Sequence, residues 1–264
     1  MNKILLAFDF DNTIVDGNSD TCIFSLFPNG KVPKDLQKMY EDEEWTAFMQ
    51  VIFQRLHDSQ VSQDTILDCV VKLPFTPGMS QFLSTLPSNK VDLIIISDSN
   101  TEFIQKFLSD NGLSNTFETV YTNPGKFDSS GLLTISVYHS QDWCNLSAKN
   151  ICKGHVLASH IAKKQEMGIK YTHIGYVGDG TNDLCPSLRL RHEDAVFARL
   201  GYSLLTKIES MKKPGSLLSI SAPVHVWESG LDLMPVVTGW CESLSVDAVP
   251  GPSRLLSANT TPSS

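Results

Sequence analysis

Short, nearly continuous hydrophobic segments recur three times along the chain, at residues 4–8, 93–96 and 174–177. A run of this length without polar alternation is typical of a β-strand that is covered on both faces, as in a parallel sheet. Hydrophobic residues at helical spacing follow the second run, and a helix predicted over 156–167 leads into the third. Strands that alternate with helices predict a three-layer α/β architecture built on a parallel sheet.

Each of the three hydrophobic runs ends in a cluster of polar residues. These clusters are residues 9–13, 97–100 and 178–183. In open parallel sheets, ligands bind beyond the carboxyl ends of the strands, where all three clusters would lie. We therefore expect the clusters to meet at one edge of the sheet.

The stretch between the first two predicted strands is too long for a loop in a compact domain. It contains helical hydrophobic patterns, which are strongest over residues 45–56. We predict that residues 17–73 form a small helical cap inserted after the first strand, while residues 1–16 and 74–242 form the core. The alternative is that these helices pack as extra elements on one face of the sheet. Residues 243–264 are poor in core-forming side chains and are predicted to be a disordered tail.

Charge and length narrow the classes of partner. The 264 residues include 21 Lys and Arg against 29 Asp and Glu, a net charge of −8, which provides no basic surplus for a nucleic acid. No hydrophobic run approaches the roughly 20 residues of a membrane helix. The amino-terminal run meets Asp9 and Asp11 too soon for a secretory signal. We expect a soluble cytoplasmic protein without nucleic-acid or membrane partners; its oligomeric state is left open.

The cysteines give little indication of a metal site. A chain of this length does not need disulfides, and a cytoplasmic setting would keep thiols reduced. No Cys-x-x-Cys spacing occurs, so a zinc site formed by His139, Cys144, Cys152 and His155 has weak support, and ordinary thiols and surface histidines are expected there. The six cysteines are Cys22, Cys69, Cys144, Cys152, Cys185 and Cys241.

Four aspartates gather at two of the predicted strand ends. Asp9 and Asp11 follow the first strand, and Asp179 and Asp183 follow the third. Alternation along an extended strand would direct Asp9, Asp11 and Thr13 to one side. Crowded carboxylates repel one another, and a hard cation with oxygen ligands would relieve that repulsion; Mg²⁺ fits best. Helix capping explains a single residue such as Asp183, but not the whole group.

A hydroxyl and an ammonium group complete the predicted site. Ser97 ends the second strand, and Lys153 lies just before the helix predicted over 156–167. A donor, an ammonium and Mg²⁺ around a carboxylate suit phosphoryl transfer, which is catalysed by positioning and charge neutralisation. One carboxylate can attack phosphorus and form an aspartyl phosphate. A second carboxyl group can protonate the leaving oxygen and then activate water.

The order of these motifs carries a family resemblance. DFDNT at residues 9–13, Ser97 after a hydrophobic strand, Lys153, and GDGTND at residues 178–183 follow one another along the chain. They resemble the four ordered motifs of the haloacid dehalogenase (HAD) superfamily, and Asp11 resembles the acid/base residue of its phosphatases. The resemblance implies a HAD-like, Rossmann-like parallel sheet and a Mg²⁺-dependent phosphomonoesterase.

The resemblance also implies catalytic and metal-binding roles, residue by residue. Asp9 would be the nucleophile and a Mg²⁺ ligand. Asp11 would be the acid/base residue and a ligand through its backbone carbonyl. Asp179 would be a further ligand, and Asp183 would support the metal-binding residues from behind.

Phosphate and substrate binding fall to a second group of residues. By the same resemblance, Ser97 and Lys153 would bind the phosphate, with Lys149 as the alternative lysine. Asp20 and Asp98 are acidic residues that the core chemistry does not need. Beside a phosphate they favour a substrate that also carries a cation. Capping of local turns by Asp20 and Asp98 is an alternative of equal weight.

Longer matches indicate a narrower family. They resemble the family that contains pyridoxal-phosphate phosphatases and phosphoethanolamine/phosphocholine phosphatases, from about residue 3 to 233. This implies a small cationic phosphate monoester as substrate, with pyridoxal 5′-phosphate first and phosphoethanolamine or phosphocholine as the alternative. A phosphomutase and an inactive phospholigand-binding module are weaker alternatives. The matching segments are DFDNTIVDGNSD (9–20), LPFTPGM (73–79), IIISDSN (94–100) and YVGDGTNDLCP (176–186).

The chain departs from this narrower family at one segment. Residues 144–147 read Cys-Asn-Leu-Ser, where the relatives carry Cys-x-x-Cys. A metal or redox role of this segment is therefore in doubt from the sequence.

Overall fold

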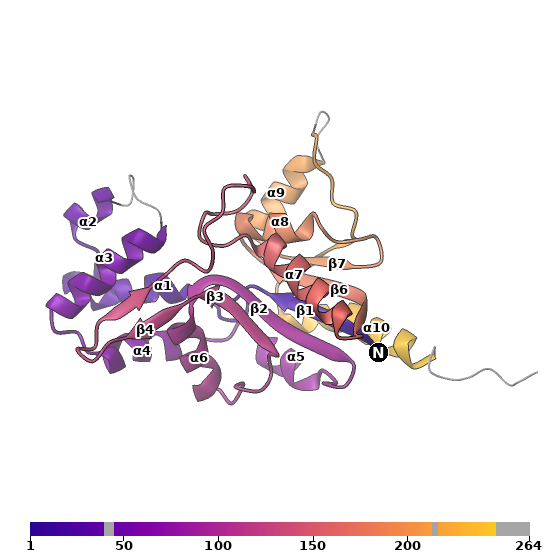
Figure 1. The fold of residues 1–264 in the computed structure, drawn as a ribbon, viewed down its shortest axis with the longest axis horizontal. Coiled ribbons are helices and arrows are strands. Elements are labelled where there is room, and N and C mark those ends of the chain that lie inside the picture. The colour runs from indigo at the N-terminus through magenta and orange to yellow at the C-terminus, as the bar shows by residue number, and fades with distance from the viewer. Residues whose placement is uncertain (40–44, 213–215, 247–264) are drawn as a thin grey trace, which may run out of the picture.

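The computed structural model describes residues 1–39, 45–212 and 216–246. A six-stranded parallel sheet forms its centre, in the order β3-β2-β1-β6-β7-β8, and β4 and β5 form a separate antiparallel hairpin (Figure 1). The three strands expected from the hydrophobic runs, β1, β2 and β6, are neighbours in this sheet. The strands are β1 (Asn2–Phe8), β2 (Val91–Asn100), β3 (Thr119–Asn123), β4 (Gly125–Phe127), β5 (Leu133–Ile135), β6 (Lys170–Gly178), β7 (Ala195–Arg199) and β8 (Val224–Trp227).

Helices cover both faces of the sheet, which confirms the three-layer α/β architecture. Alternate residues of β1 belong to two different buried clusters, with Leu6 and Phe8 on one face and Leu5 and Ala7 on the other. The helices are α1 (Ser19–Cys22), α2 (Lys34–Met39), α3 (Trp45–Asp58), α4 (Gln63–Val71), α5 (Met79–Thr85), α6 (Thr101–Asp110), α7 (Lys153–Glu166), α8 (Leu184–Ser187), α9 (Ser203–Met211) and α10 (Met234–Val246), with 3₁₀ turns η1 (Ile23–Leu26), η2 (Pro28–Gly30), η3 (Thr181–Asp183) and η4 (Gly230–Leu233).

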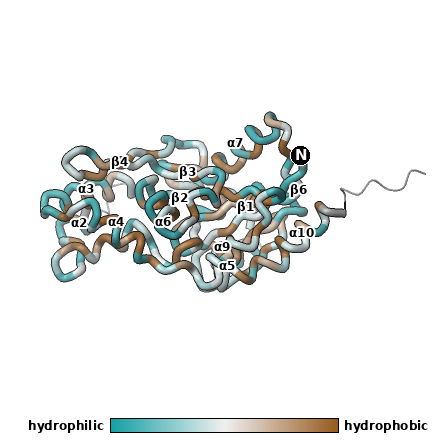
Figure 2. The backbone as a smooth tube through the Cα atoms, turned by 90° about the horizontal axis from the view of Figure 1, so that it is seen from below, coloured by the Kyte–Doolittle hydropathy of each residue, from teal (hydrophilic) through white to brown (hydrophobic). Residues whose placement is uncertain are grey.

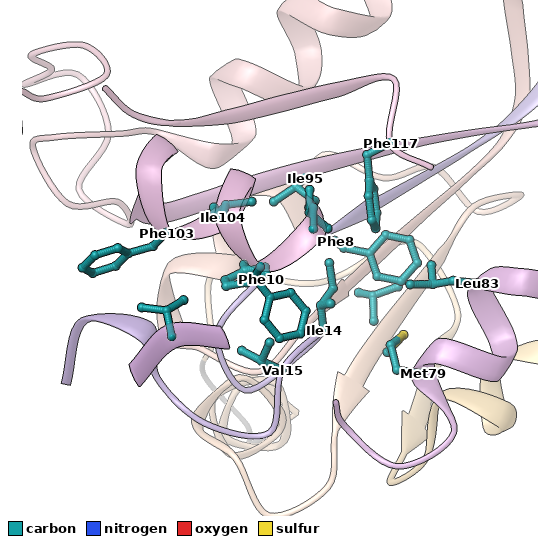
Figure 3. Close-up of a cluster of buried hydrophobic side chains, with 14 of the residues drawn as sticks. Phe8, Phe10, Ile14, Val15, Met79, Leu83, Ile95, Phe103, Ile104 and Phe117 are labelled. Carbon is teal, nitrogen blue, oxygen red and sulfur yellow. The ribbon is translucent and has the colours of Figure 1, made fainter. Parts of the chain in front are cut away.

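The larger cluster joins one sheet face to α5 and α6. Figure 3 shows Phe8 between Phe117 and Leu83, with Phe10 nearer α6. The rings of Phe8 and Phe117 meet edge to face, with centroids 6.1 Å apart, and Phe10 and Phe107 do so at 5.5 Å. Hydrophobic stretches run through the middle of the molecule in Figure 2, while outer turns are hydrophilic. Burial of these large side chains holds the helices against the sheet.

The register of the central strands brings their carboxyl ends to one place. Phe8 of β1 pairs with Ile95 of β2 on one side and with Val177 of β6 on the other. The residues after β1 and β6 therefore leave the sheet beside residues 97–100, which form the last part of β2 rather than following it as expected. The register fixes the base of the site.

Two local expectations were wrong. Strand β1 ends at Phe8, and residues 10–15 form tight turns in which Asn12 adopts a left-handed conformation with φ of 51°. Strand alternation therefore does not orient Asp11 or Thr13. Helix α7 begins at Lys153 rather than at 156, so Lys153 is its first residue instead of preceding it.

Helices α1 to α4 lie beyond the carboxyl ends of the strands, at the far end of the molecule from the amino terminus (Figure 1). They are not separated from the rest, because the rings of Phe53 on α3 and Phe103 on α6 meet edge to face at 5.9 Å. The β4–β5 hairpin joins them, since Gln50 of α3 bonds to the backbone of Leu133 and Ile135. A cap at 17–73 and a core at 1–16 and 74–242 stay predictions.

The carboxyl-terminal boundary differs from the expected one. Helix α10 continues to Val246, so residues 243–246 are helical, although their sequence is poor in core-forming side chains. The rest of the predicted disordered tail, residues 247–264, lies outside the described residues.

Candidate functional site

Carboxylates from two strand ends meet at the centre of the sheet edge. Oxygen atoms of Asp9, after β1, and of Asp179 and Asp183, after β6, lie within 4.8 Å of one another. All three side chains are buried. Hydrogen bonds hold each in place: the amide of Phe10 donates to Asp9 at 2.7 Å, and the hydroxyl of Thr13 donates to Asp179 at 3.4 Å.

Asp183 is an internal acceptor that organises the loop after β6. Its Oδ2 accepts the backbone amides of Asp179 and Gly180 at 3.0 and 2.9 Å. Its Oδ1 accepts the hydroxyl of Tyr176 at 2.8 Å. A Cβ atom at Gly178 would lie 2.4 Å from Asp183 Oδ2, so only glycine leaves room for this carboxylate. The GDGTND motif thus folds around its own last residue.

Lys153 places one cation against this carboxylate group. Its Nζ lies 2.6 Å from Asp9 Oδ2 and 2.8 Å from Asp183 Oδ1, and its side chain is fully buried. Lys149, the alternative lysine, is exposed. The difference arises because Lys153 is the first residue of α7 and its side chain is buried against Asp9 and Asp183. Lys153 is therefore the lysine that the fold brings to the acidic cluster.

The carboxylate of Asp11 is bound through a chain of hydroxyls. It accepts the amide and the hydroxyl of Ser19 at 2.8 and 3.1 Å. The Ser19 hydroxyl lies 2.7 Å from that of Ser99, and the amide of Ser99 donates to Ser97 Oγ at 3.2 Å. This chain joins the start of α1 to the end of β2, although Asp11 is not one of the three clustered carboxylates.

Asp20 and Asp98 have partners inside the protein. The indole Nε1 of Trp45 donates to Asp20 at 2.7 Å, and the Asn182 amide donates to Asp98 at 2.9 Å. The local caps are instead Asn18, which caps α1, and Asn100, which caps α6. Turn capping by Asp20 and Asp98 is therefore not what the structure contains. Their role in substrate binding stays a prediction.

Four residues that hold the site together were missed as functional residues: Ser19, Ser99, Tyr176 and Trp45. Ser19 follows Asn18, a typical helix cap, so the start of a helix beside Asp20 was readable. Ser99 and Trp45 contribute through partners that are distant in sequence, and Tyr176 reaches Asp183 across the turn after β6, so no local pattern indicates these pairs.

Electrostatics test whether these residues fit a divalent cation. Burial, followed by repulsion from Asp183, raises the pKa of Asp9 well above its ordinary value despite Lys153. Burial raises the pKa of Asp11 to about 8 and that of Asp179 to about 7, with neighbouring carboxylates adding to both shifts. The buried carboxylates carry more negative charge than the ammonium of Lys153 can neutralise. Such a group of oxygen ligands suits a hard ion such as Mg²⁺. The donor set therefore fits the cofactor.

One large cavity in the described part of the chain lies away from the carboxylates. It has a volume of about 650 Å³ and lies at the amino end of β6, lined by Tyr171, Ile174 and Leu157 among others. That end is opposite the carboxylates, because β6 leads from Tyr171 towards Asp179. This cavity therefore does not mark the candidate site, which is identified by the convergence of charged side chains.

The zinc ligands considered from the sequence do not come together as a set. Cys144 and Cys152 lie close to each other, but their third neighbour is Cys185 rather than a histidine. The Nε2 of His139 accepts the amide of Cys152 at 2.9 Å.

No helix in the described part of the chain is both long and apolar enough to cross a bilayer.

Known proteins that are similar to this chain in sequence are described as phosphatases. A family model described as "Putative Phosphatase" matches residues 4–241. Mouse pyridoxal phosphate phosphatase PHOSPHO2 is 43% identical over 234 residues, which are 88% of this chain and 96% of that protein. Human phosphoethanolamine/phosphocholine phosphatase is 32% identical over 233 residues, 88% and 86% of the two chains.

Solved structures share the fold at much lower identity. A phospho-aspartyl intermediate analogue of phosphoserine phosphatase has a TM-score of 0.57 at 15% identity, covering 89% of this chain and 99% of that one. A HAD family hydrolase from Salmonella enterica also has a TM-score of 0.57, at 16% identity over 88% and 69% of the two chains.

Proposed function

Because this chain belongs to that phosphatase family and has the fold of the HAD hydrolases, we propose that it hydrolyses pyridoxal 5′-phosphate through an aspartyl-phosphate intermediate, with Mg²⁺ as cofactor. The observation that carries the chemistry is the position of Lys153, within 2.8 Å of both Asp9 and Asp183 at the edge where Asp179 also lies. The similarity to a pyridoxal phosphate phosphatase supports the choice of substrate.

Asp9 is the proposed nucleophile. Its Oδ1 accepts the amide of Phe10, which holds the carboxylate while Oδ2 faces Lys153. The ammonium of Lys153 would neutralise phosphate charge that otherwise repels the attacking carboxylate. Attack of a carboxylate oxygen on phosphorus forms the P–O bond to Asp9 and breaks the bond to the leaving oxygen.

Asp11 is the proposed acid and base. Burial raises the pKa of Asp11 to about 8, so the carboxyl group holds a proton near neutral pH that it can give to the leaving oxygen. The resulting carboxylate then takes a proton from the water that hydrolyses the aspartyl phosphate. Both hydrogen bonds from Ser19 remain available to the carboxylate form in the second step.

A divalent cation completes the site in this proposal. Asp9, Asp179 and the backbone carbonyl of Asp11 would hold Mg²⁺, and Asp183 would support them through the amides of Asp179 and Gly180. The ion would supply positive charge against the phosphate oxygens. Ser97, in the carboxyl-terminal part of β2, would bind the phosphate through its hydroxyl.

Asp20 and Asp98 are proposed to favour a substrate that carries a cation. Each is held by a protein donor at one oxygen, Asp20 by Trp45 and Asp98 by Asn182. A carboxylate has about four acceptor positions, so each retains the capacity to bind a protonated ring nitrogen or an amine. Phosphoethanolamine and phosphocholine are the second candidate substrates, supported by the human relative named for both.

A phosphate-release panel tests the function and the substrate together. With Mg²⁺ present, we expect kcat/KM for pyridoxal 5′-phosphate to exceed those for phosphoethanolamine, phosphocholine and pyrophosphate by about tenfold or more, a difference of about 1.4 kcal/mol in transition-state binding. The Asp9→Asn variant is the background control. A preference for phosphocholine or phosphoethanolamine would mean that pyridoxal 5′-phosphate is not the main substrate. No phosphate release from any of the four compounds would refute the proposed function.

A further inference from the structure

Three cysteine side chains meet outside the carboxylate site. Cys144 Sγ lies 3.4 Å from Cys185 Sγ, and Cys152 Sγ lies 3.7 Å from Cys185 Sγ. All three sulfur atoms lie within 4.8 Å of one another, and all are free thiols. They come from the segment before α7, from the residue that caps α7, and from α8. Separate parts of the chain thus converge on one point.

The spacing of these sulfur atoms matches a tetrahedral ion. With zinc–sulfur bonds of about 2.3 Å, sulfur atoms around one zinc ion lie about 3.8 Å apart. A fourth atom is available, since Ser147 Oγ lies 3.5 Å from Cys144 Sγ. An oxygen bound at about 2.0 Å would lie about that far from a zinc-bound sulfur. Ser147 or water can therefore complete four ligands.

The surroundings favour the thiolate form at Cys144 and oppose it at Cys185. Burial opposes ionisation of Cys144, but hydrogen bonds from the Ser147 hydroxyl and the Leu146 amide outweigh it and lower the pKa of Cys144 to about 7. Burial raises the pKa of Cys185 to about 11, although the Arg189 side chain hydrogen-bonds to it, so this thiol loses its proton only when a metal binds. A Cβ at residue 154 would lie 2.5 Å from Cys185 Sγ, so Gly154 leaves the space in which that sulfur lies.

We propose that Cys144, Cys152 and Cys185 bind a zinc ion as thiolates, with Ser147 or water as the fourth ligand. Each thiol releases its proton when the sulfur–metal bond forms, so binding is coupled to proton release. Cys152 and Cys185 are fully or almost fully buried, while Cys144 is half-buried and is the ligand that solvent reaches most easily.

This ion would brace the phosphatase site without taking part in its chemistry. Cys152 directly precedes Lys153, and Cys185 lies two residues after Asp183. Lys153 and Asp183 are themselves paired at 2.8 Å. A metal that joins the starts of α7 and α8 would fix the distance between these two partners. The inference concerns different ligands from the carboxylate site and does not depend on the proposed substrate.

Cobalt titration of the reduced, metal-free full chain tests the site. With excess Mg²⁺ present to fill the carboxylate site, we expect Co²⁺ to produce a near-ultraviolet thiolate-to-metal charge-transfer band and the visible bands of tetrahedral Co²⁺. These should saturate at one ion per chain, and Zn²⁺ should abolish them. Oxygen ligands alone cannot give the charge-transfer band.

Matched variants keep the test specific. Cys185→Ser should lose the charge-transfer band, whereas Cys241→Ser, which changes a cysteine on α10, should retain it. Ser147→Cys should supply a fourth thiolate and lower the Co²⁺ dissociation constant by about tenfold or more. Absence of the band in the wild-type chain, or its persistence in Cys185→Ser, would overturn the proposal. So would a thiol count in denatured protein that revealed a disulfide within the cluster.

Discussion

At the scale of single residues, Lys153 is the cation that pairs with two carboxylates of the candidate site. Its side chain is fully buried between these carboxylates. Removing one partner of a buried ion pair costs far more folding stability than the intact pair contributes, because it leaves a buried charge without a partner. From the sequence, the family resemblance named Lys153 first and kept Lys149 as the alternative. Burial and ion pairing give the physical reason for that order.

Lys153→Met should therefore affect both stability and activity. It leaves Asp9 and Asp183 facing each other without their cation, so we expect a loss of about 3–5 kcal/mol in unfolding free energy and a melting temperature lower by roughly 10 °C. Lys149→Met changes an exposed side chain and should stay within about 0.5 kcal/mol of wild type. Thermal melting and phosphate release measure both variants; equal behaviour of the two would contradict the assignment.

Asp11→Asn tests the acid/base role at the same scale. The amide oxygen of asparagine can still accept the Ser19 backbone amide, so the fold should persist. It cannot cycle a proton, and kcat should fall by about 10²–10⁴-fold. Acid quenching with radiolabelled substrate should then trap phosphoenzyme, whereas Asp9→Asn should trap none. Turnover at the wild-type rate in Asp11→Asn would rule out the role.

At the scale of elements, a buried polar chain fastens α7 to the sheet. His160 on α7 contacts the hydroxyl of Tyr121 on β3 at 2.9 Å and that of Tyr171 on β6 at 3.2 Å, and Tyr171 donates to Asp92 on β2 at 2.8 Å. This arrangement suits a neutral imidazole that donates through Nε2 and accepts through Nδ1. Because α7 also carries Lys153, the chain helps to place the site.

The protonation of His160 should make this attachment depend on pH. Burial lowers the pKa of His160 in the folded state below its unfolded value of about 6.5. The unfolded chain therefore binds the proton first as pH falls, and the contribution of neutral His160 is complete above about pH 6.5 and lost below it.

Urea denaturation of wild type and His160→Gln should reveal this loss. The advantage of wild type over the variant should shrink between about pH 7.5 and pH 5.5, while the exposed His192→Gln change should produce little trend. An advantage that grows towards acid pH would contradict a neutral buried His160.

Element prediction succeeded where the hydrophobic pattern was continuous. The runs at 4–8, 93–96 and 174–177 all became central strands, and the strong pattern over 45–56 became α3. Strand β7 was missed although Ala195–Arg199 contains a readable hydrophobic run, whereas Val224–Trp227 alternates only weakly. Strand β8 lies at the edge of the sheet, and a short edge strand is poorly indicated by its own sequence, whereas β7 is an inner strand whose hydrophobic run was overlooked.

At the scale of the whole molecule, the acidic site couples metal binding to stability. Carboxylates crowded within 4.8 Å destabilise the folded chain, and an ion that binds only the folded state relieves that repulsion. The carboxylates come from strands far apart in sequence, so the coupling acts on the global fold.

Mg²⁺ should accordingly raise the melting temperature and support activity. EDTA should abolish phosphate release, and added Mg²⁺ should restore it and raise the melting temperature by several degrees at about 100 times its dissociation constant. Asp179→Asn should diminish this thermal shift, whereas Asp64→Asn, an exposed change on α4, should preserve it. A shift unaffected by Asp179→Asn would place the ion elsewhere.

The sequence by itself determined the layer architecture, the identity of the central strands and the edge at which the polar clusters meet. These follow from local properties, because hydrophobic runs and their polar ends specify a buried parallel strand and its exit wherever it lies. Motif order was equally local, so the candidate catalytic residues could be named before their geometry was known.

Only the tertiary structure decided which side chains touch. It buried Lys153 rather than Lys149, bound Asp11 through Ser19, gave Asp20 and Asp98 internal partners, and joined Cys185 to Cys144 and Cys152. Each of these contacts joins residues that are adjacent through packing rather than along the chain. Contact partners depend on the register and tilt of whole elements, which are set by the sum of many buried contacts and not by any local pattern.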